Sequence, residues 1–309
     1  MNRYRDFNRY LRDLFGERVH KISLDAGMTC PNRDGTISKK GCIFCDSRGS
    51  GTGAMINDGQ SLDEQIRLSV QFVQKRYRAR KYIVYFQSFS NTYGSIEDLR
   101  KIYGQALAHK NMVGLSVATR PDCVNKDIIK LLSSYQKQYL VWIELGLQSA
   151  HNRTLKLINR GHDADCFRHS VRLAHKWGLN ICTHIIIGLP GEDREMILDT
   201  AKYIADLPIR GVKLHLMYII KGTALAKLYQ KGSYKCLAQE EYVELVVDFL
   251  EYLPPDIIIQ RLVSDPRKYE LIAPTWAQKK RENMDLINKA LERRNTCQGT
   301  LYGKSTAGE

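Results

Sequence analysis

Six short apolar runs recur along the chain, and longer segments with helical periodicity separate them. The runs cover residues 19–25, 82–87, 113–118, 140–148, 181–187 and 211–218. Most are nearly continuous in apolar residues, which is typical of parallel strands covered on one or both faces, and helices rather than tight turns connect them. The pattern predicts an α/β fold, a partial (β/α)6 TIM barrel.

Two appendages are expected around this core. Residues 1–19 have apolar Phe7, Leu11 and Leu14 at helical spacing, so we predict an N-terminal helical arm packed on the barrel exterior. The barrel core would span residues 20–263 and include one further strand at 257–263. Residues 264–309 would form a basic, mostly helical C-terminal extension.

Helix boundaries can be read from local signals. Ser61 with Glu64 forms the pattern of a capping box, and Asn125 can cap the helix that follows it. A helix over residues 163–177 should end at Gly178, because glycine readily adopts the left-handed conformation that ends many helices.

The first predicted strand leads into a loop that carries three cysteines. Cys30, Cys42 and Cys45 are separated by eleven and two residues. Three thiolates would leave one iron of a cubane iron–sulfur cluster open to an exchangeable ligand, whereas structural zinc prefers four protein ligands. Three nearby cations would favour thiolates and offset an anionic cluster: Arg33, Lys39 and Lys40. The alternative from spacing is a zinc site with a histidine as fourth ligand.

Polar side chains stand near the C-terminal ends of the predicted strands, where barrels of parallel strands hold their chemistry. They are Gln87, Arg120, Asp122, Glu144, Gln148 and His215. Glu144 lies within an apolar strand, and burying a carboxylate is costly without a cationic or hydrogen-bonding partner. A ligand ammonium or ribose would be such a partner, and an ion pair with Arg120 is the structural alternative.

Two loops add further candidate ligand contacts. Arg160, in a loop after the fourth strand, suits a ligand carboxylate, with an ordinary surface loop as the alternative. Gly188 and Gly191 follow the fifth strand and would let the backbone approach a flat ligand such as adenine. A tight turn between strand and helix explains the two glycines equally well.

The charge of the chain is an argument about its partners. A formal net charge of +14, from 47 Lys and Arg against 33 Asp and Glu, favours a polyanion. Basic residues gather at 76–81, 279–281 and 293–294, with Tyr77, Tyr82 and Trp276 nearby as candidate stacking surfaces. A solvated charged surface is the alternative for each cluster. No stretch reaches the ~18 apolar residues that span a bilayer and no signal segment is evident, so we expect a cytoplasmic protein.

Four segments taken together resemble the Elp3-like branch of the radical S-adenosylmethionine (SAM) superfamily. They are the three-cysteine loop and residues 144–149, 159–162 and 186–192. From Val19 to Trp276 the chain further resembles a bacterial family within that branch, the MnmL-type proteins linked to tRNA wobble-uridine modification. The segments that carry this second resemblance are residues 30–36, 119–123 and 271–276.

This resemblance implies cofactors, a reaction and partners. It implies one [4Fe-4S] cluster held by Cys30, Cys42 and Cys45, with SAM chelating the open iron and yielding a 5′-deoxyadenosyl radical on reduction. The implied substrate is tRNA, in which carboxymethylaminomethyl-2-thiouridine becomes aminomethyl-2-thiouridine, and the implied electron donor resembles flavodoxin or ferredoxin. The predicted SAM contacts are Gln87, Arg120, Asp122, Glu144, Gln148, Arg160, Gly188 and Gly191.

Two other functions remain open at this point. A radical SAM enzyme could act on a small metabolite or a protein side chain, with the basic charge incidental. A zinc-stabilised nucleic-acid-binding protein would also use a three-cysteine loop and a basic surface. No catalytic residue is predicted beyond the cofactor contacts.

Overall fold

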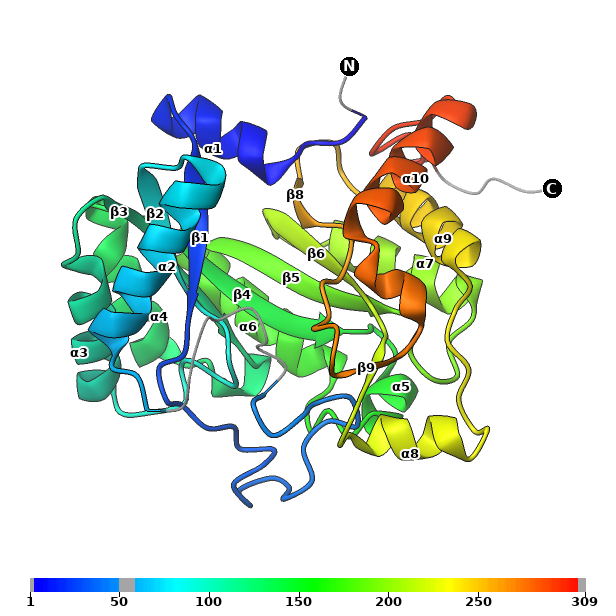
Figure 1. The fold of residues 1–309 in the computed structure, drawn as a ribbon, viewed down its shortest axis with the longest axis horizontal. Helices are drawn as coiled ribbons and strands as arrows, with labels where there is room; N and C mark the ends of the chain where they lie inside the picture. The colour runs from blue at the N-terminus through cyan, green and yellow to red at the C-terminus, as the bar shows by residue number, and fades with distance from the viewer. Residues whose placement is uncertain (1–2, 50–58, 305–309) are drawn as a thin grey trace.

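A seven-stranded parallel sheet forms the centre of the computed structural model, which describes residues 3–49 and 59–304. Its strands stand in the order β1, β2, β3, β4, β5, β6, β8 and curve into a half-barrel (Figure 1). Their bounds are β1 Val19–Leu24, β2 Lys81–Phe86, β3 Met112–Thr119, β4 Leu140–Gln148, β5 Asn180–Ile187, β6 Gly211–Leu216 and β8 Ile258–Arg261. The predicted α/β partial barrel is confirmed, and the further strand expected at 257–263 is β8.

Helices between the strands cover the outer face of the sheet, as crossovers between parallel strands must. They are α2 Leu62–Tyr77, α3 Ile96–Leu107, α4 Lys126–Ser134, α6 Ala164–Lys176, α7 Arg194–Ala205 and α9 Gln239–Tyr252. The short α5 (Asn152–Leu157) lies instead at the strand ends, where Leu155 joins an apolar cluster with Leu189 and Leu225. The side chains of Ser61 and Asn125 accept backbone N–H groups at the starts of α2 and α4, as predicted. Gly178 has a positive φ of 69° just after α6.

The N-terminal helix α1 (Phe7–Phe15) packs across the N-terminal end of the strands. Phe7 and Leu11 are buried there in one apolar cluster with Trp142 of β4 and Ile258 of β8. The segment before the helix also joins the edge strand, because Asp6 forms a parallel bridge with Ile259. This helix therefore closes the end of the half-barrel opposite the three-cysteine loop.

A short helix α8 (Ala224–Gln230) and an antiparallel pair of β7 (Ile219–Ile220) with β9 (Leu271–Ala273) pack in the apolar cluster at the strand ends, and α10 (Lys280–Arg293) packs on α9. Arg294 at the end of α10 pairs with Asp248 and Glu251 of α9, and Arg293 pairs with Glu244. The basic pair at 293–294 is therefore neutralised by a neighbouring helix. The domain limits at residues 19 and 263 stay predictions.

The edge strands β1 and β8 do not pair with each other, so the half-barrel has an open side. The C-terminal ends of the strands face the three-cysteine loop that follows β1 (Figure 1). Two openings therefore reach the barrel interior, one at the strand ends and one at the side.

Candidate functional site

A cavity opens at the C-terminal ends of the strands. Eight of the predicted site residues line it: Cys30, Cys42, Cys45, Gln87, Arg120, Glu144, Gln148 and Arg160. His215 lines it as well. Asp122, Gly188 and Gly191 do not belong to the lining.

The three-cysteine loop is fixed to the segment that follows α5. Asn32 is fully buried, and its Nδ2 donates to the backbone oxygen of Asn159 at 2.6 Å and approaches the Cys42 sulfur at 3.6 Å. In return, Asn159 Nδ2 donates to the backbone oxygen of Gly41 at 2.6 Å. These reciprocal bonds hold the loop over the cavity, so Asn32 and Asn159 position the cysteines.

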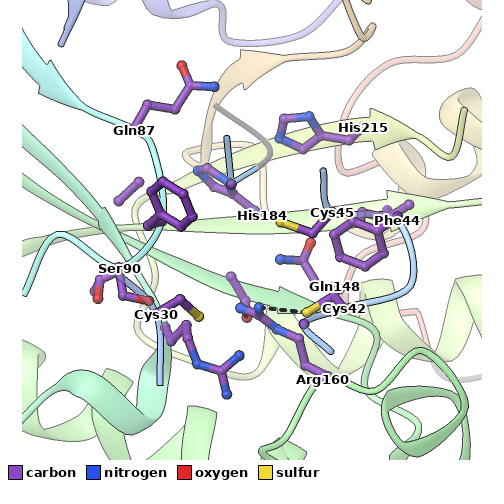
Figure 2. A pocket seen from close by; sticks show the side chains of 18 of the residues that line it. Cys30, Cys42, Phe44, Cys45, Gln87, Ser90, Gln148, Arg160, His184 and His215 are labelled. Carbon is purple, nitrogen blue, oxygen red and sulfur yellow. Dashed lines mark hydrogen bonds between the residues drawn. The ribbon is translucent and has the colours of Figure 1, made fainter. Parts of the chain in front are cut away.

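Arg160 lies beside the cysteines and is buried. Its Nη1 approaches the Cys42 sulfur at 3.6 Å and its Nη2 donates to the backbone oxygen of Gly146 at 2.8 Å. In the view of Figure 2, its guanidinium lies between the sulfur atoms of Cys30 and Cys42. The Nε of Arg160 is buried without a partner among the described residues.

Arg120 provides a second buried cation on this side of the cavity. Asp122 binds it through two hydrogen bonds of 2.9 and 2.7 Å, which explains why Asp122 stands behind the lining and not in it. The Nη1 of Arg120 is also buried without a partner in the described part of the chain. Because buried donors are nearly always satisfied, the free N–H groups of Arg120 and Arg160 indicate an anionic or acceptor-bearing ligand.

The cysteines fit an iron–sulfur cluster better than a single zinc ion. Ligands of one zinc lie about 3.8 Å apart, from tetrahedral bonds of about 2.3 Å. Within residues 3–49 and 59–304, Cys30, Cys42 and Cys45 do not form a group of ligand atoms that all lie within 4.8 Å of one another. Thiolates on separate iron corners stand further apart, and the two arginines match the negative charge of such a cluster.

The two glycines after β5 serve packing in this structure. A Cβ on Gly188 would lie 2.9 Å from the side chain of Leu237, and the Tyr234 hydroxyl donates to the Gly188 oxygen at 2.7 Å. A Cβ on Gly191 would meet only the Leu157 side chain, at 3.8 Å. Their positive φ angles, 90° and 79°, fit the tight turn that was the alternative explanation.

The loop after β2 contributes residues that sequence reasoning missed. Phe89 has a φ of 62°, and its ring lies only 2.6 Å from where a Cβ on Gly49 would be. Ser90 is buried and lines the cavity. The polar run Ser88 to Thr92, directly after an apolar strand, is the signal that could have identified this loop.

Glu144 occupies the centre of a polar layer inside the barrel. It is fully buried, and its Oε1 accepts from Lys21 Nζ at 2.5 Å and from the Ser116 hydroxyl. Its Oε2 accepts from His184 Nε2 at 2.7 Å and from Lys213 Nζ. Four protein donors thus use the four acceptor positions of this carboxylate. The alternative pair with Arg120 is not formed, because Arg120 binds Asp122.

Burial and charge set the protonation of this layer. Burial alone would raise the pKa of Glu144, but Lys21 and Lys213 outweigh it and hold that pKa well below its usual value. Burial lowers the pKa of Lys213 to about 7 and that of His184 to about 4. His184 is therefore neutral at pH 7 and donates its Nε2–H to Glu144. Sequence reasoning missed Lys21 and Lys213, although Lys213 and His215 alternate in β6 as inward-facing residues do.

A second opening lies at the side of the half-barrel, between β1 and β8. Arg76 and Tyr77 from the end of α2 line it on one side, and Lys280 from the start of α10 lines it on the other. Two of the basic clusters predicted from sequence therefore meet there. Tyr77 stacks on His20 with ring centroids 4.4 Å apart, but Tyr82 is fully buried, so the prediction that it offers a stacking surface is wrong. Trp276 packs on Tyr242.

No helix in the described ranges is long and apolar enough to cross a membrane.

Comparison with known proteins identifies the family of this chain. The family model of the Radical SAM superfamily matches residues 30–204, and the Radical_SAM C-terminal domain matches residues 209–293. The chain is 43% identical to the Bacillus subtilis protein YtqA over 97% of this chain and 93% of that one. It is 30% identical to a tRNA uridine(34) acetyltransferase of Methanocaldococcus jannaschii over 55% of this chain and 31% of that one.

Among solved structures, the archaeal Elp3 of Methanocaldococcus infernus superposes with a TM-score of 0.69 at 20% identity, covering 91% of this chain and 64% of that one. The two proteins therefore share the half-barrel fold. The chain belongs to the radical SAM superfamily.

Proposed function

We propose that this protein uses a [4Fe-4S] cluster and SAM to generate a radical that modifies the wobble uridine of tRNA. The observation that carries the proposal is the meeting of three cysteines and two buried, incompletely bonded arginines at the mouth of the barrel cavity. When bound, the reduced cluster supplies the electron that cleaves SAM into methionine and a 5′-deoxyadenosyl radical.

The chain's own residues then have separable tasks. Cys30, Cys42 and Cys45 would hold the cluster, with Arg160 beside the Cys42 sulfur. The free N–H groups of Arg120 and Arg160 suit the carboxylate of SAM, since charge-assisted hydrogen bonds to carboxylates are strong. Ser90, Gln148 and Gln87 complete the polar lining on which SAM would be oriented.

Support for tRNA comes from charge and from a relative. The side opening brings together Arg76, Tyr77 and Lys280, a combination of cations and an aromatic ring that suits a nucleic-acid backbone and its bases. The M. jannaschii relative is by its name a tRNA uridine(34) acetyltransferase. By resemblance, the reaction proposed here converts carboxymethylaminomethyl-2-thiouridine to aminomethyl-2-thiouridine, with a flavodoxin or ferredoxin as electron donor.

The cofactor proposal is tested by anaerobic reconstitution. We expect about four irons per chain, and loss of iron when the three cysteines are changed to Ala. Cys297→Ala is the matched control, because Cys297 is exposed and remote from the loop in sequence. Stoichiometric zinc in protein purified without air would contradict the proposal.

The substrate proposal is tested in cells that lack the gene. Mass analysis of tRNA nucleosides should show that carboxymethylaminomethyl-2-thiouridine accumulates while its aminomethyl successor is lost. An unchanged nucleoside profile would reject this substrate and favour a radical SAM enzyme on a small metabolite or a protein, without affecting the cluster prediction.

A further inference from the structure

The polar layer inside the barrel holds more positive than negative charge. Lys21, Lys213 and Arg261 all belong to it, and Glu144 is its one carboxylate among the described residues. Lys21 and Lys213 share Glu144, whereas Arg261 forms no ion pair in the part of the chain that the structure describes. The proximity of Arg261 contributes to lowering the pKa of His215. Lys213 is buried and Lys21 and Arg261 are half-buried, and an excess of cations with so little water around it is costly unless an anion completes it.

The acidic residues at the side opening do not supply that anion. Asp265 pairs with Lys280 at 2.8 Å, at the outer rim. Asp6 caps α1 by accepting the N–H groups of Asn8 and Arg9. The excess of positive charge therefore remains inside the barrel.

Two buried nitrogen atoms in the same region also have no partner among residues 3–49 and 59–304. They are Nε2 of His215 on β6 and Nε2 of Gln260 on β8. The Gln260 amide uses its oxygen to accept from Lys21 at 2.8 Å, which leaves its N–H groups free. The free N–H groups of Gln260, and the His215 N–H in the tautomer that carries its proton on Nε2, lie beside unbalanced cations, and this combination indicates an acceptor with negative charge.

The layer lies between the two openings of the barrel. Tyr85 and Gln87 line both the cavity at the cysteines and the opening between β1 and β8. In the view of Figure 2, Gln87 and His215 lie at the end of the cavity opposite Cys30, Cys42 and Arg160, and Cys45 lies between. An anion held at this layer would therefore place the atoms attached to it near the site proposed for SAM.

The shape of the layer favours a carboxylate over a backbone phosphate. The Tyr85 ring covers the layer, with Lys213 Nζ 4.1 Å and Lys21 Nζ 4.9 Å from its centroid. A carboxylate at the end of a short arm can enter such a place. A phosphodiester is joined to a nucleotide on each side, so it cannot enter this place and would stay at the rim with Arg76 and Lys280.

We propose that this layer is a carboxylate-binding subsite, in which Arg261 and Lys213 bind the terminal carboxylate of the substrate group from which the radical takes a hydrogen atom. The carboxylate class follows from the layer itself. Its assignment to the carboxymethylaminomethyl group rests on the proposed function.

The test measures binding to anaerobically reconstituted protein by fluorescence anisotropy. Two anticodon stem–loop RNAs are compared, one with carboxymethylaminomethyl-2-thiouridine and one with 2-thiouridine at the wobble position. Wild type should bind the first about tenfold to hundredfold more tightly, as expected for one charge-assisted contact. Arg261→Gln should lose this preference, whereas Arg172→Gln, the same change at an exposed position on α6, should keep it.

Two outcomes with RNA would overturn the subsite. One is equal binding of both RNAs by wild type, and the other is a preference that survives in Arg261→Gln. An equal weakening of both RNAs by Arg261→Gln would mean that this arginine binds backbone phosphate, and it would overturn the subsite too.

If wild type binds neither RNA, the tRNA proposal fails and N-methylglycine decides the subsite. We expect ligand-observed NMR to detect its binding to wild type and to Arg172→Gln, with about tenfold weaker binding to Arg261→Gln. No binding to wild type, or equal binding to all three proteins, would overturn the carboxylate subsite.

Discussion

Replacing Glu144 with Gln tests whether this carboxylate serves the protein or a ligand. Both of its oxygens already accept from protein donors, with Lys21 on one and Lys213 on the other. The amide keeps the shape but carries no charge, so two ammonium groups would share the barrel interior without a counter-charge. Removing one partner of a buried ion pair costs about 3–5 kcal/mol. We therefore expect Glu144→Gln to lower the free energy of unfolding by about that amount near pH 6.

The loss should become smaller as the pH rises. Burial lowers the pKa of Lys213 to about 7 in the folded protein, while the same amine in the unfolded chain keeps a pKa of about 10.4. Between these values the unfolded chain binds more protons than the folded one, so the contribution of Lys213 to stability rises with pH. At pH 9 Lys213 is neutral in wild type as well, and only the Lys21 contact distinguishes wild type from Glu144→Gln. We expect the deficit at pH 9 to be roughly half of that at pH 6.

The assay is urea unfolding followed by far-UV circular dichroism at pH 6 and pH 9, with SAM affinity measured in parallel. Lys213→Met and the double variant Glu144→Gln/Lys213→Met complete a mutant cycle. The double variant should be more stable than Glu144→Gln because it removes one of the two unpaired ammonium groups. An unchanged unfolding midpoint in Glu144→Gln together with a tenfold loss of SAM affinity would refute this reasoning and identify Glu144 as a SAM contact.

Three further predictions concern the site and its rim. Gly49→Ala should shift the Phe89 loop, because the added Cβ would lie 2.6 Å from the Phe89 ring, and we expect SAM binding to weaken about tenfold. The control is Gly16→Ala, which has a similar positive φ but open space around it and should leave SAM affinity unchanged. Arg160→Ala should keep the iron content of the protein but weaken SAM binding, and Arg172→Ala is the control. Equal SAM affinity in the two variants would show that Arg160 only holds the three-cysteine loop and does not contact SAM. Arg76→Ser should reduce the slope of log K for RNA against log salt by about 0.7–0.9. Lys280→Ser and Arg293→Ser should change it less, because Asp265 already pairs Lys280 and Glu244 already pairs Arg293; an equal effect of all three would contradict this assignment.

Most strands could be predicted because they are buried on both faces, so their apolar runs are nearly continuous in sequence; β1 instead alternates between buried and half-buried residues. The helix starts could be predicted because the signal is local: Ser61 and Asn125 bond N–H groups only three residues away. The position of α1 depends on contacts with Trp142 and Ile258, which lie far along the chain. The spacing of apolar residues predicts that α1 has an apolar face, but it does not show on which part of the barrel this face packs.

The candidate site likewise combines features that the sequence predicts with features that depend on residues far along the chain. The burial of Glu144 was evident from its apolar neighbours, but its partners come from β1 and β6, on opposite sides of the half-barrel. Gly188 shows a different limit. Its positive φ follows from the turn, but sequence cannot tell whether a ligand or the Leu237 side chain occupies the space beside it.

The open side of the half-barrel explains how a charged layer can exist in its interior. A closed barrel fills its centre with layers of packed side chains, and such a centre would leave the cations at Glu144 without water. Because β1 and β8 do not pair, water reaches the layer from the side, and the Lys21 side chain keeps 15% of its exposed surface. A substrate that fills the opening would displace this water and lower the local dielectric constant. The attraction between the unpaired cations and a substrate carboxylate would then strengthen as the substrate enters, so the same gap that admits the substrate also increases the selectivity for its charge.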